Sequence, residues 1–401
     1  MKTVAVAGTF DTKAKEFQYV ISLLEKKGIR AYTIHTGVFE PKFKPDVSNE
    51  EIAERAGTDI VSLAAGRDRA LATETLSRGM ELLLPELYQK GKFDGILSMG
   101  GSGGTSLVTP AMRALPLGVP KVMVSTMASG NVEQYVGTSD IVMMPSIVDV
   151  AGLNEISTMV FSNAVNAVAG MVNGEKAEEK EKKPLVAATM FGVTTPCVDA
   201  AKAYLEDRGY EVLVFHATGT GGKAMETLVR NGFIQGVLDM TTTELCDELV
   251  GGVLSAGPNR LTAAGEKKIP QVVSVGAMDM VNFGPPDTVP SKFSDRKFYQ
   301  HNPTVTLMRT TEEENQELGK ILAEKLNRAK GKTAVYLPLK GVSGIDTKDA
   351  PFYGEKEDKA LFDAIRKNIT PTVEITELDF DINDPEFAEA AAQKLIDYME
   401  N

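Results

Sequence analysis

Cysteine and histidine are scarce in this chain of 401 residues, which has two cysteines and three histidines. Cys197 and Cys246 are too few for a disulfide framework, and so few thiols are typical of a reducing compartment. The chain has neither the HExxH pattern of zinc peptidases nor the GxSxG pattern of serine hydrolases, and its histidines and cysteines are not clustered. A catalytic zinc site and a serine-hydrolase mechanism are therefore excluded.

The chain also lacks a block of basic residues and an apolar run long enough to cross a membrane. Its formal net charge of −12 argues against nucleic acid as a partner. The opening MKTVAVAGTF runs directly into an expected strand and has no apolar leader region. We therefore expect a soluble, cytoplasmic protein that binds neither nucleic acid nor membranes. Small anions remain candidate ligands, because backbone dipoles bind them whatever the net charge.

What the chain does contain is a repeated pattern. Residues 4–37 and 185–219 share an apolar strand, a loop, an amphipathic helix that reaches glycine, and a second apolar run that ends at histidine. Gly28 corresponds to Gly209 and His35 to His216 at one constant offset. The correspondence continues with gaps, pairing 93–104 with 233–245, 120–128 with 270–278, and 140–146 with 304–310.

Alternating strands and helices of this kind predict an α/β fold with mostly parallel sheets. We expect two Rossmann-like subdomains related by internal duplication. The segment 173–184 is charged and closed by proline, which is typical of a linker. The expected organisation is a nucleotide-binding subdomain at 1–174, a linker at 175–184, and a second subdomain with a C-terminal extension at 185–401.

The loop after the first strand carries charged candidates. It runs from Gly8 and Thr9 through Asp11 to Lys13. Gly8 would let a ligand approach the backbone, Asp11 could bind a ribose hydroxyl or a magnesium-bound water, and Lys13 could meet a phosphate. Asp11 could equally cap the following helix. The second copy lacks both charges, which favours a function in the first copy.

A glycine cluster follows the third expected strand: Gly100, Gly101, Ser102, Gly103, Gly104 and Thr105. A tight turn needs one or two glycines, not four, because each adds ordering entropy. A glycine-rich turn that opens a helix presents consecutive N–H groups and a positive dipole end, which suits phosphate. The loop is similar to the GGDGT loop of NAD kinases and diacylglycerol kinases, with Ser102 in place of the aspartate. The next loop is small and polar, and its candidates for the nucleotide are Thr126, Ser129, Gly130 and Asn131.

Three residues of the second half are candidate catalytic groups. Glu244 follows a threonine-rich turn and could hold a substrate or cap a helix. Arg296 and His301 lie in the long, proline-rich stretch 276–311, and long loops often carry function. Arg296 could bind a carboxylate or phosphate with two hydrogen bonds, and His301 could act as a general acid or base or only as a structural hydrogen bonder. A weaker candidate is an anion-binding nest at Gly219–Lys223.

The segments GTFDTK, MGGSGGTS, FGPPDTVPSKFSDRKFYQHNPTVTLMRT and PFYGEKEDKALFDAIRKNI carry a family resemblance. With them the chain resembles bacterial homologues of the N-terminal ATP-binding domain of the tomato mosaic virus resistance protein, over essentially its whole length. The resemblance implies two Rossmann-like subdomains, an ATP site in the first, and a homodimer. In the plant protein a TIM-barrel region follows, so this chain is expected to be the stand-alone form.

These observations lead to three functional hypotheses. The first is an ATP-using enzyme, with Mg²⁺, that acts on a small anionic substrate in a cleft between the subdomains. The second is a module that binds ATP and senses it without turnover. The third is an organic-acid enzyme that uses Glu244, Arg296 and His301 without ATP.

Overall fold

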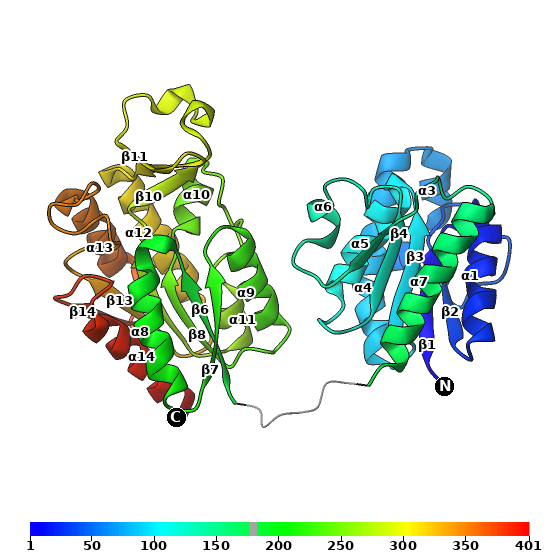
Figure 1. Ribbon diagram of the computed structural model, residues 1–401, viewed down its shortest axis with the longest axis horizontal. Coiled ribbons are helices and arrows are strands. Elements are labelled where there is room, and N and C mark those ends of the chain that lie inside the picture. Colours follow the sequence, from blue (N-terminus) through cyan, green and yellow to red (C-terminus); the bar gives the residue numbers. More distant parts are fainter. Residues whose placement is uncertain (176–182, 401) are drawn as a thin grey trace. The chain divides into compact units, whose positions relative to one another are not determined.

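The computed structural model describes residues 1–175 and 183–400. The chain divides into two compact units, Met1–Glu178 and Glu179–Asn401 (Figure 1). The expected linker at 175–184 lies largely outside the described residues. In the part of the chain that the structure describes, no helix combines the length and apolar character that a membrane crossing requires.

The first unit is built on one five-stranded sheet in the order β2-β1-β3-β4-β5, with every neighbouring pair parallel. Its strands are β1 (Thr3–Gly8), β2 (Arg30–His35), β3 (Gly95–Gly100), β4 (Lys121–Ser125) and β5 (Val142–Pro145). Its helices are α1 (Ala14–Lys26), α2 (Asn49–Arg55), α3 (Ile60–Gly66), α4 (Arg69–Gln89), α5 (Ser102–Ala114), α6 (Glu133–Val136) and α7 (Glu155–Asn173).

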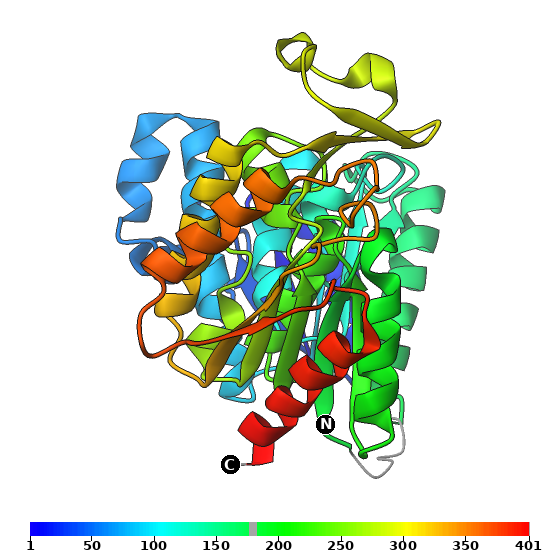
Figure 2. The same ribbon diagram turned by 90° about the vertical axis from the view of Figure 1, so that its left-hand side faces the viewer.

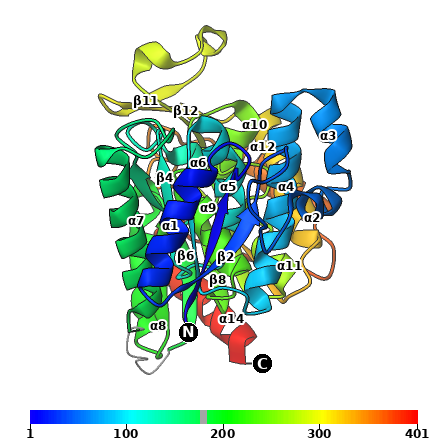
Figure 3. The same cartoon turned by 90° about the vertical axis from the view of Figure 1, so that its right-hand side faces the viewer.

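Alternate residues of β1 enter two different cores. Val4 and Val6 pack with α1 and α7, which lie side by side on one face of the sheet (Figure 3). Ala5 and Ala7 pack with α2, α4 and α5 on the other face. Because side chains alternate along a strand, a continuous apolar run is what a strand covered on both faces requires.

The second unit repeats this plan with a six-stranded parallel sheet in the order β14-β13-β9-β8-β6-β7. Its strands are β6 (Leu185–Met190), β7 (Glu211–His216), β8 (Gly236–Thr241), β9 (Gln271–Gly276), β13 (Thr333–Pro338) and β14 (Glu374–Leu378). Its α-helices are α8 (Thr195–Glu206), α9 (Thr220–Arg230), α10 (Glu244–Val250), α11 (Ala263–Lys267), α12 (Glu312–Asn327), α13 (Glu355–Asn368) and α14 (Pro385–Glu400). Helices α8 and α14 cover one face of the sheet, and the other helices cover the opposite face.

The expected α/β fold with two similar subdomains is confirmed. Read from β7, the second sheet has the strand order of the first sheet, with β14 added at its edge. The aromatic pairs agree as well. Phe10 stacks on His35 with ring centroids 5.5 Å apart, and Phe191 stacks on His216 at 5.5 Å.

One expected correspondence, 140–146 with 304–310, is wrong. Residues 142–145 form β5 of the first parallel sheet, whereas 305–309 form β12 (Val305–Arg309) of a separate antiparallel sheet. That sheet also contains β10 (Met280–Phe283) and β11 (Phe298–Asn302). The true counterpart of β5 is β13, which lies beside β9. A short apolar run does not reveal whether its neighbours will be parallel or antiparallel.

The stretch between β10 and β11 projects beyond the rest of the second unit (Figure 2). It contains two short 3-10 helices, η2 (Pro286–Thr288) and η3 (Ser291–Phe293), and a further one, η1 (Gly192–Thr194), precedes α8. The stretch 276–311, which was expected to be a long loop, therefore contains an ordered three-stranded sheet.

Candidate functional site

The candidate loops of the first unit meet at one edge of its sheet. From β1 the chain passes to β2 on one side and later to β3 on the other, so β1 and β3 flank the point where strand order reverses. Ligands of open α/β sheets bind beyond the carboxyl ends of the strands at this point. The loops after β1, β3 and β4 all leave from that edge. The register pairs Ala7 with Ser98 and Gly100 with Ser125.

The glycine cluster forms the turn between β3 and α5. Gly101 is the N-cap residue, and no side chain caps the helix. Thr105 donates no N–H to a ligand, because its N–H bonds to the Gly101 carbonyl. The N–H groups of the first turn before it have no partner within their own helix, and helix α5 adds its dipole. This turn can therefore accept an anion.

The structure gives different reasons for different glycines. A Cβ at Gly8 would overlap the Phe17 ring at 1.9 Å, so Gly8 is required by packing rather than by a ligand. A Cβ at Gly100 would lie 3.1 Å from the Cα of Gly104, which makes these two a close backbone contact. At Gly101 the nearest atom to a Cβ would be 3.7 Å away. Side-chain crowding therefore does not require glycine at position 101.

Buried hydroxyls hold the turn in place. The Thr105 hydroxyl lies 2.6 Å from the Ser125 hydroxyl and donates to the Gly101 carbonyl at 2.8 Å. Both residues are fully buried. Ser125 also accepts the Met127 N–H at 3.0 Å, which ties the loop after β4 to the same point. Thr105 therefore positions the glycine turn, while Ser102 is exposed.

The remaining candidates of the loop after β4 are on the surface. Thr126, Ser129, Gly130 and Asn131 are all exposed. The Thr126 N–H donates to the Gly100 carbonyl at 3.3 Å, so this loop borders the glycine turn. Asn131 accepts at 2.9 Å the N–H of Glu133, the first residue of the short helix α6.

The charged groups of the loop after β1 are bound to the chain itself. Lys13 donates its ammonium to the Val150 carbonyl. The Asp11 carboxylate accepts the N–H of Thr12 at 2.8 Å and that of Phe39 at 3.3 Å. The hydroxyls of Thr9 and Thr12 lie 3.1 Å apart. These contacts fix the loop to the rest of the unit, and the Lys13 ammonium already has a hydrogen-bond partner within the chain.

A cation that the sequence reasoning missed does lie at the turn. A Cβ on Gly103 would come within 3.3 Å of the Arg69 guanidinium. In the described part of the chain, this guanidinium has no hydrogen bond or ion pair. Arg69 is the first residue of α4, and Asp68 caps that helix by accepting the Leu71 N–H at 3.0 Å. The sequence feature that could have indicated Arg69 is the inserted helix with its capping Asp68, which the second copy lacks.

The equivalent edge of the second unit is filled by its own side chains. Glu244 is fully buried and accepts the N–H groups of Gly219 at 2.7 Å and Gly222 at 3.1 Å. These glycines belong to the nest considered for an external anion. The other Glu244 oxygen accepts the Arg260 Nε–H at 2.5 Å, and Arg260 also binds Asp239 through two nitrogens. Burial alone would lower the pKa of Arg260, but these carboxylates raise it well above its usual value. Glu244 thus has the contacts of a structural ion pair.

The other two candidates of the second unit are not joined to Glu244 by hydrogen bonds. Arg296 makes a two-pronged ion pair with Glu314 at 2.8 and 2.6 Å and donates to the Arg309 carbonyl. His301 is exposed on β11. The two-pronged geometry expected of Arg296 is present, but its partner is a carboxylate of the chain.

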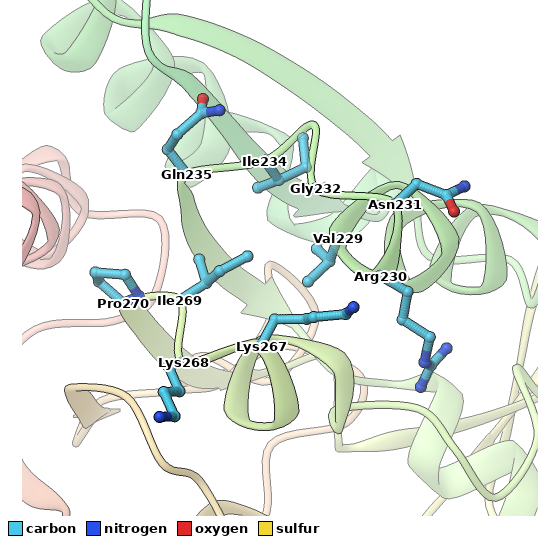
Figure 4. Close-up of a pocket in the computed structure, with 10 residues that line it drawn as sticks. All are labelled: Val229, Arg230, Asn231, Gly232, Ile234, Gln235, Lys267, Lys268, Ile269 and Pro270. Carbon is cyan, nitrogen blue, oxygen red and sulfur yellow. The ribbon is translucent and has the colours of Figure 1, made fainter. Parts of the chain in front are cut away.

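A hollow of about 520 Å³ lies elsewhere on the second unit (Figure 4). Residues 229–232, 234–235 and 267–270 line it, at the amino ends of β8 and β9. Of its three cationic side chains, Arg230, Lys267 and Lys268, the first pairs with Glu226 and Glu266. The hollow is at the sheet edge opposite to the one where such folds bind ligands, so it is not the candidate site.

Comparison with known proteins identifies relatives along the whole chain. Residues 2–177 match the N-terminal domain, and residues 183–399 the C-terminal domain, of the uncharacterised protein family UPF0261. A UPF0261 protein of Clostridium tetani is 54% identical over 401 residues, covering 100% of this chain and 99% of that protein. The ToMV resistance protein Tm-1(GCR237) of Solanum lycopersicum is 48% identical over 336 residues, which are 82% of this chain and 45% of the tomato protein.

Solved structures give only a distant likeness. A UDP-GlcNAc 2-epimerase of Methanocaldococcus jannaschii, in complex with UDP-GlcNAc and UDP, is 12% identical and covers 68% of this chain and 83% of its own. Its TM-score of 0.23 is too low to support an argument about function. The sequence matches, in contrast, extend over both units. The chain belongs to the uncharacterised protein family UPF0261.

Proposed function

We propose that this protein binds ATP at the carboxyl edge of its first sheet and uses it in a reaction on a small anionic substrate. The observation that carries the proposal is the glycine turn of Gly100–Thr105. It opens α5 without a side-chain cap, at the point where strand order reverses. Backbone N–H groups at such a helix start bind phosphate oxygens. Arg69 lies beside the turn and would contribute the positive side chain that Lys13 was expected to supply.

The contrast between the two copies supports this assignment. In the second unit the glycine nest is filled by Glu244, and Arg260 balances the charge. In the first unit no carboxylate of the described residues accepts an N–H of the α5 turn. The filled nest follows β7, the counterpart of β2, whereas the open turn follows β3, so the two positions are not equivalent. What differs is that the second sheet supplies a carboxylate at its own carboxyl edge, whereas the α5 turn of the first unit receives none.

Magnesium would be held mainly by the nucleotide. Among the described residues, no group of three or more histidines, cysteines, aspartates or glutamates could hold a metal ion. Mg²⁺ commonly uses one or two carboxylates together with substrate phosphates and water. Asp11 is the proposed carboxylate, because each of its oxygens accepts a single N–H and retains a lone pair for a magnesium-bound water.

Calorimetric titration of the full chain with ATP tests the binding site. Gly103→Val should block access to the turn and abolish measurable binding. Gly170→Val on α7 is the matched control, because a Cβ there meets nothing within 4 Å and lies away from the turn. Arg69→Gln should weaken binding by about 1.5–3 kcal/mol, the range for a hydrogen bond to a charged group. Wild-type protein that binds no ATP would refute the proposal.

A second candidate function is ATP sensing without turnover. It is favoured by one observation: the charged side chains of the loop after β1 contact the chain rather than project from it. The Lys13 ammonium donates to the Val150 carbonyl, and the buried Glu16, which follows the loop in the first turn of α1, accepts the Gly152 N–H. Prolonged incubation of wild-type protein with ATP, Mg²⁺ and a panel of small organic acids separates the candidates. Phosphate or ADP release that Gly103→Val removes indicates an enzyme, and unchanged ATP indicates a sensor.

A further inference from the structure

Phe39 is unusually exposed to solvent for a phenylalanine of the first unit. Its side chain is 63% exposed, while Phe10, Phe17 and Phe161 are 0–1% exposed. It follows β2 and therefore lies at the same sheet edge as the glycine turn. We propose that Phe39 is the stacking platform for the base of the bound nucleotide. This inference rests on the proposed function and adds what that function leaves open, the part of the ligand beyond the phosphates.

Buried polar groups fix the backbone that carries this exposed ring. His35 is fully buried, and its Nδ1 accepts the Phe10 N–H at 3.1 Å. Its proton is therefore on Nε2, which donates to the Phe39 carbonyl at 2.8 Å. Asn49, also buried, donates to the Gly37 carbonyl at 2.8 Å, and Asp11 accepts the Phe39 N–H. A surface ring with no ligand to meet would not require two buried polar side chains to position its main chain.

The second unit provides an internal comparison. It keeps the stacked pair of Phe191 and His216, but His216 is exposed. The chain there turns directly into α9 at Thr220 and has no counterpart of the segment that contains Phe39. The holding contacts therefore occur in the copy with the open glycine turn and not in the copy whose nest is filled by Glu244.

The spacing fits a nucleotide that lies across β1. The strands β2, β1 and β3 are neighbours, and adjacent strands are about 4.8 Å apart, so the ends of β2 and β3 are separated by about 10 Å. That distance matches the span from the base to the phosphates of an extended nucleotide. Thr36 directly follows β2, and its N–H is bonded to the Gly8 carbonyl at the end of β1. Its hydroxyl is buried and has no hydrogen-bond partner in residues 1–175 and 183–400.

The chemical class of the ligand follows from this arrangement. Stacking on a phenylalanine contacts the face of a base and not its hydrogen-bonding edge, so it favours any nucleotide over bare polyphosphate. Inorganic tripolyphosphate is therefore the discriminating probe, because it keeps the phosphates of ATP and lacks the base and the ribose.

The test is calorimetric titration of the full chain with ATP and with tripolyphosphate. Phe39→Ala should weaken ATP binding roughly 5- to 150-fold, the value of one base stacked on an aromatic ring, and leave tripolyphosphate binding unchanged. Phe39→Tyr keeps a stacking face and should retain the ATP affinity. Equal losses for both ligands, or no loss for ATP, would overturn the inference while leaving the phosphate site intact. Wild-type protein that binds neither ligand would overturn the proposed function itself.

Discussion

Glu244 offers the sharpest test of how the second unit is built. Its carboxylate accepts two backbone N–H groups and the Arg260 Nε–H, all without exposure to solvent. Glu244→Gln preserves the shape but removes the charge, and its amide N–H₂ must face another donor. Removing one partner of a buried ion pair costs about 3–5 kcal/mol. Arg260 keeps its two bonds to Asp239, so we expect the lower end of that range.

For a unit of this size, about 3 kcal/mol corresponds to a fall of about 6–12 °C in Tm. The chain has no tryptophan, so differential scanning calorimetry with far-UV circular dichroism is the suitable measurement. Only the transition of the second unit should move. Glu248→Gln, on the exposed face of the same helix, is the matched control and should stay within about 0.5 kcal/mol of wild type. A Glu244→Gln protein that melts like wild type would refute the structural role and restore Glu244 as a candidate catalytic group.

Three further results are expected. Burial raises the pKa of Asp247 to about 7. The stabilising contribution of this carboxyl is complete below about pH 4 and is lost as pH rises through 7. Asp247→Asn should remove the corresponding slope of the unfolding free energy against pH, which is at most about 1.4 kcal/mol per pH unit. Urea denaturation at several pH values measures this slope, and a slope unchanged from wild type would contradict the prediction. Gly8→Ala should lower Tm by calorimetry because Phe17 occupies the Cβ position, at a cost of about 1–3 kcal/mol; an unchanged Tm would show that the ring can move away. Burial raises the pKa of Cys197 to about 12 and that of Cys246 well above its usual value; Ellman's reagent should therefore react with neither thiol until urea is added, and fast native reaction would contradict their burial.

Local patterns in the sequence were enough to predict the architecture. Continuous apolar runs predict strands covered on both faces, and helices with apolar residues three and four apart predict the layers between them. The repeat of Gly28 and His35 as Gly209 and His216 predicts the duplication, and the stacked pairs confirm it. The assignment of residues 304–310 failed because strand direction depends on which partner is reached, and that partner is distant in sequence.

The glycine turn was recognisable because its signal is local. Four glycines in six positions, directly after a strand and before a helix, indicate a special backbone conformation, and this can be recognised without knowing the tertiary contacts of the segment. The roles of single side chains could not be predicted in this way. Lys13 contacts Val150, far along the chain, and Asp11 contacts Phe39. Whether a charge is paired or unpaired is decided by such distant contacts.

The sequence by itself therefore determined the two α/β units, their duplication and the glycine turn that opens α5, because backbone propensity and periodicity are properties of adjacent residues. Only the tertiary structure decided which groups fill each site. It placed Glu244 in the nest of the second unit, put Arg69 of an inserted helix beside Gly103, and held Phe39 in solvent. The physical reason is that hydrogen bonds and ion pairs depend on distance in space, which the fold sets and the order of residues does not show.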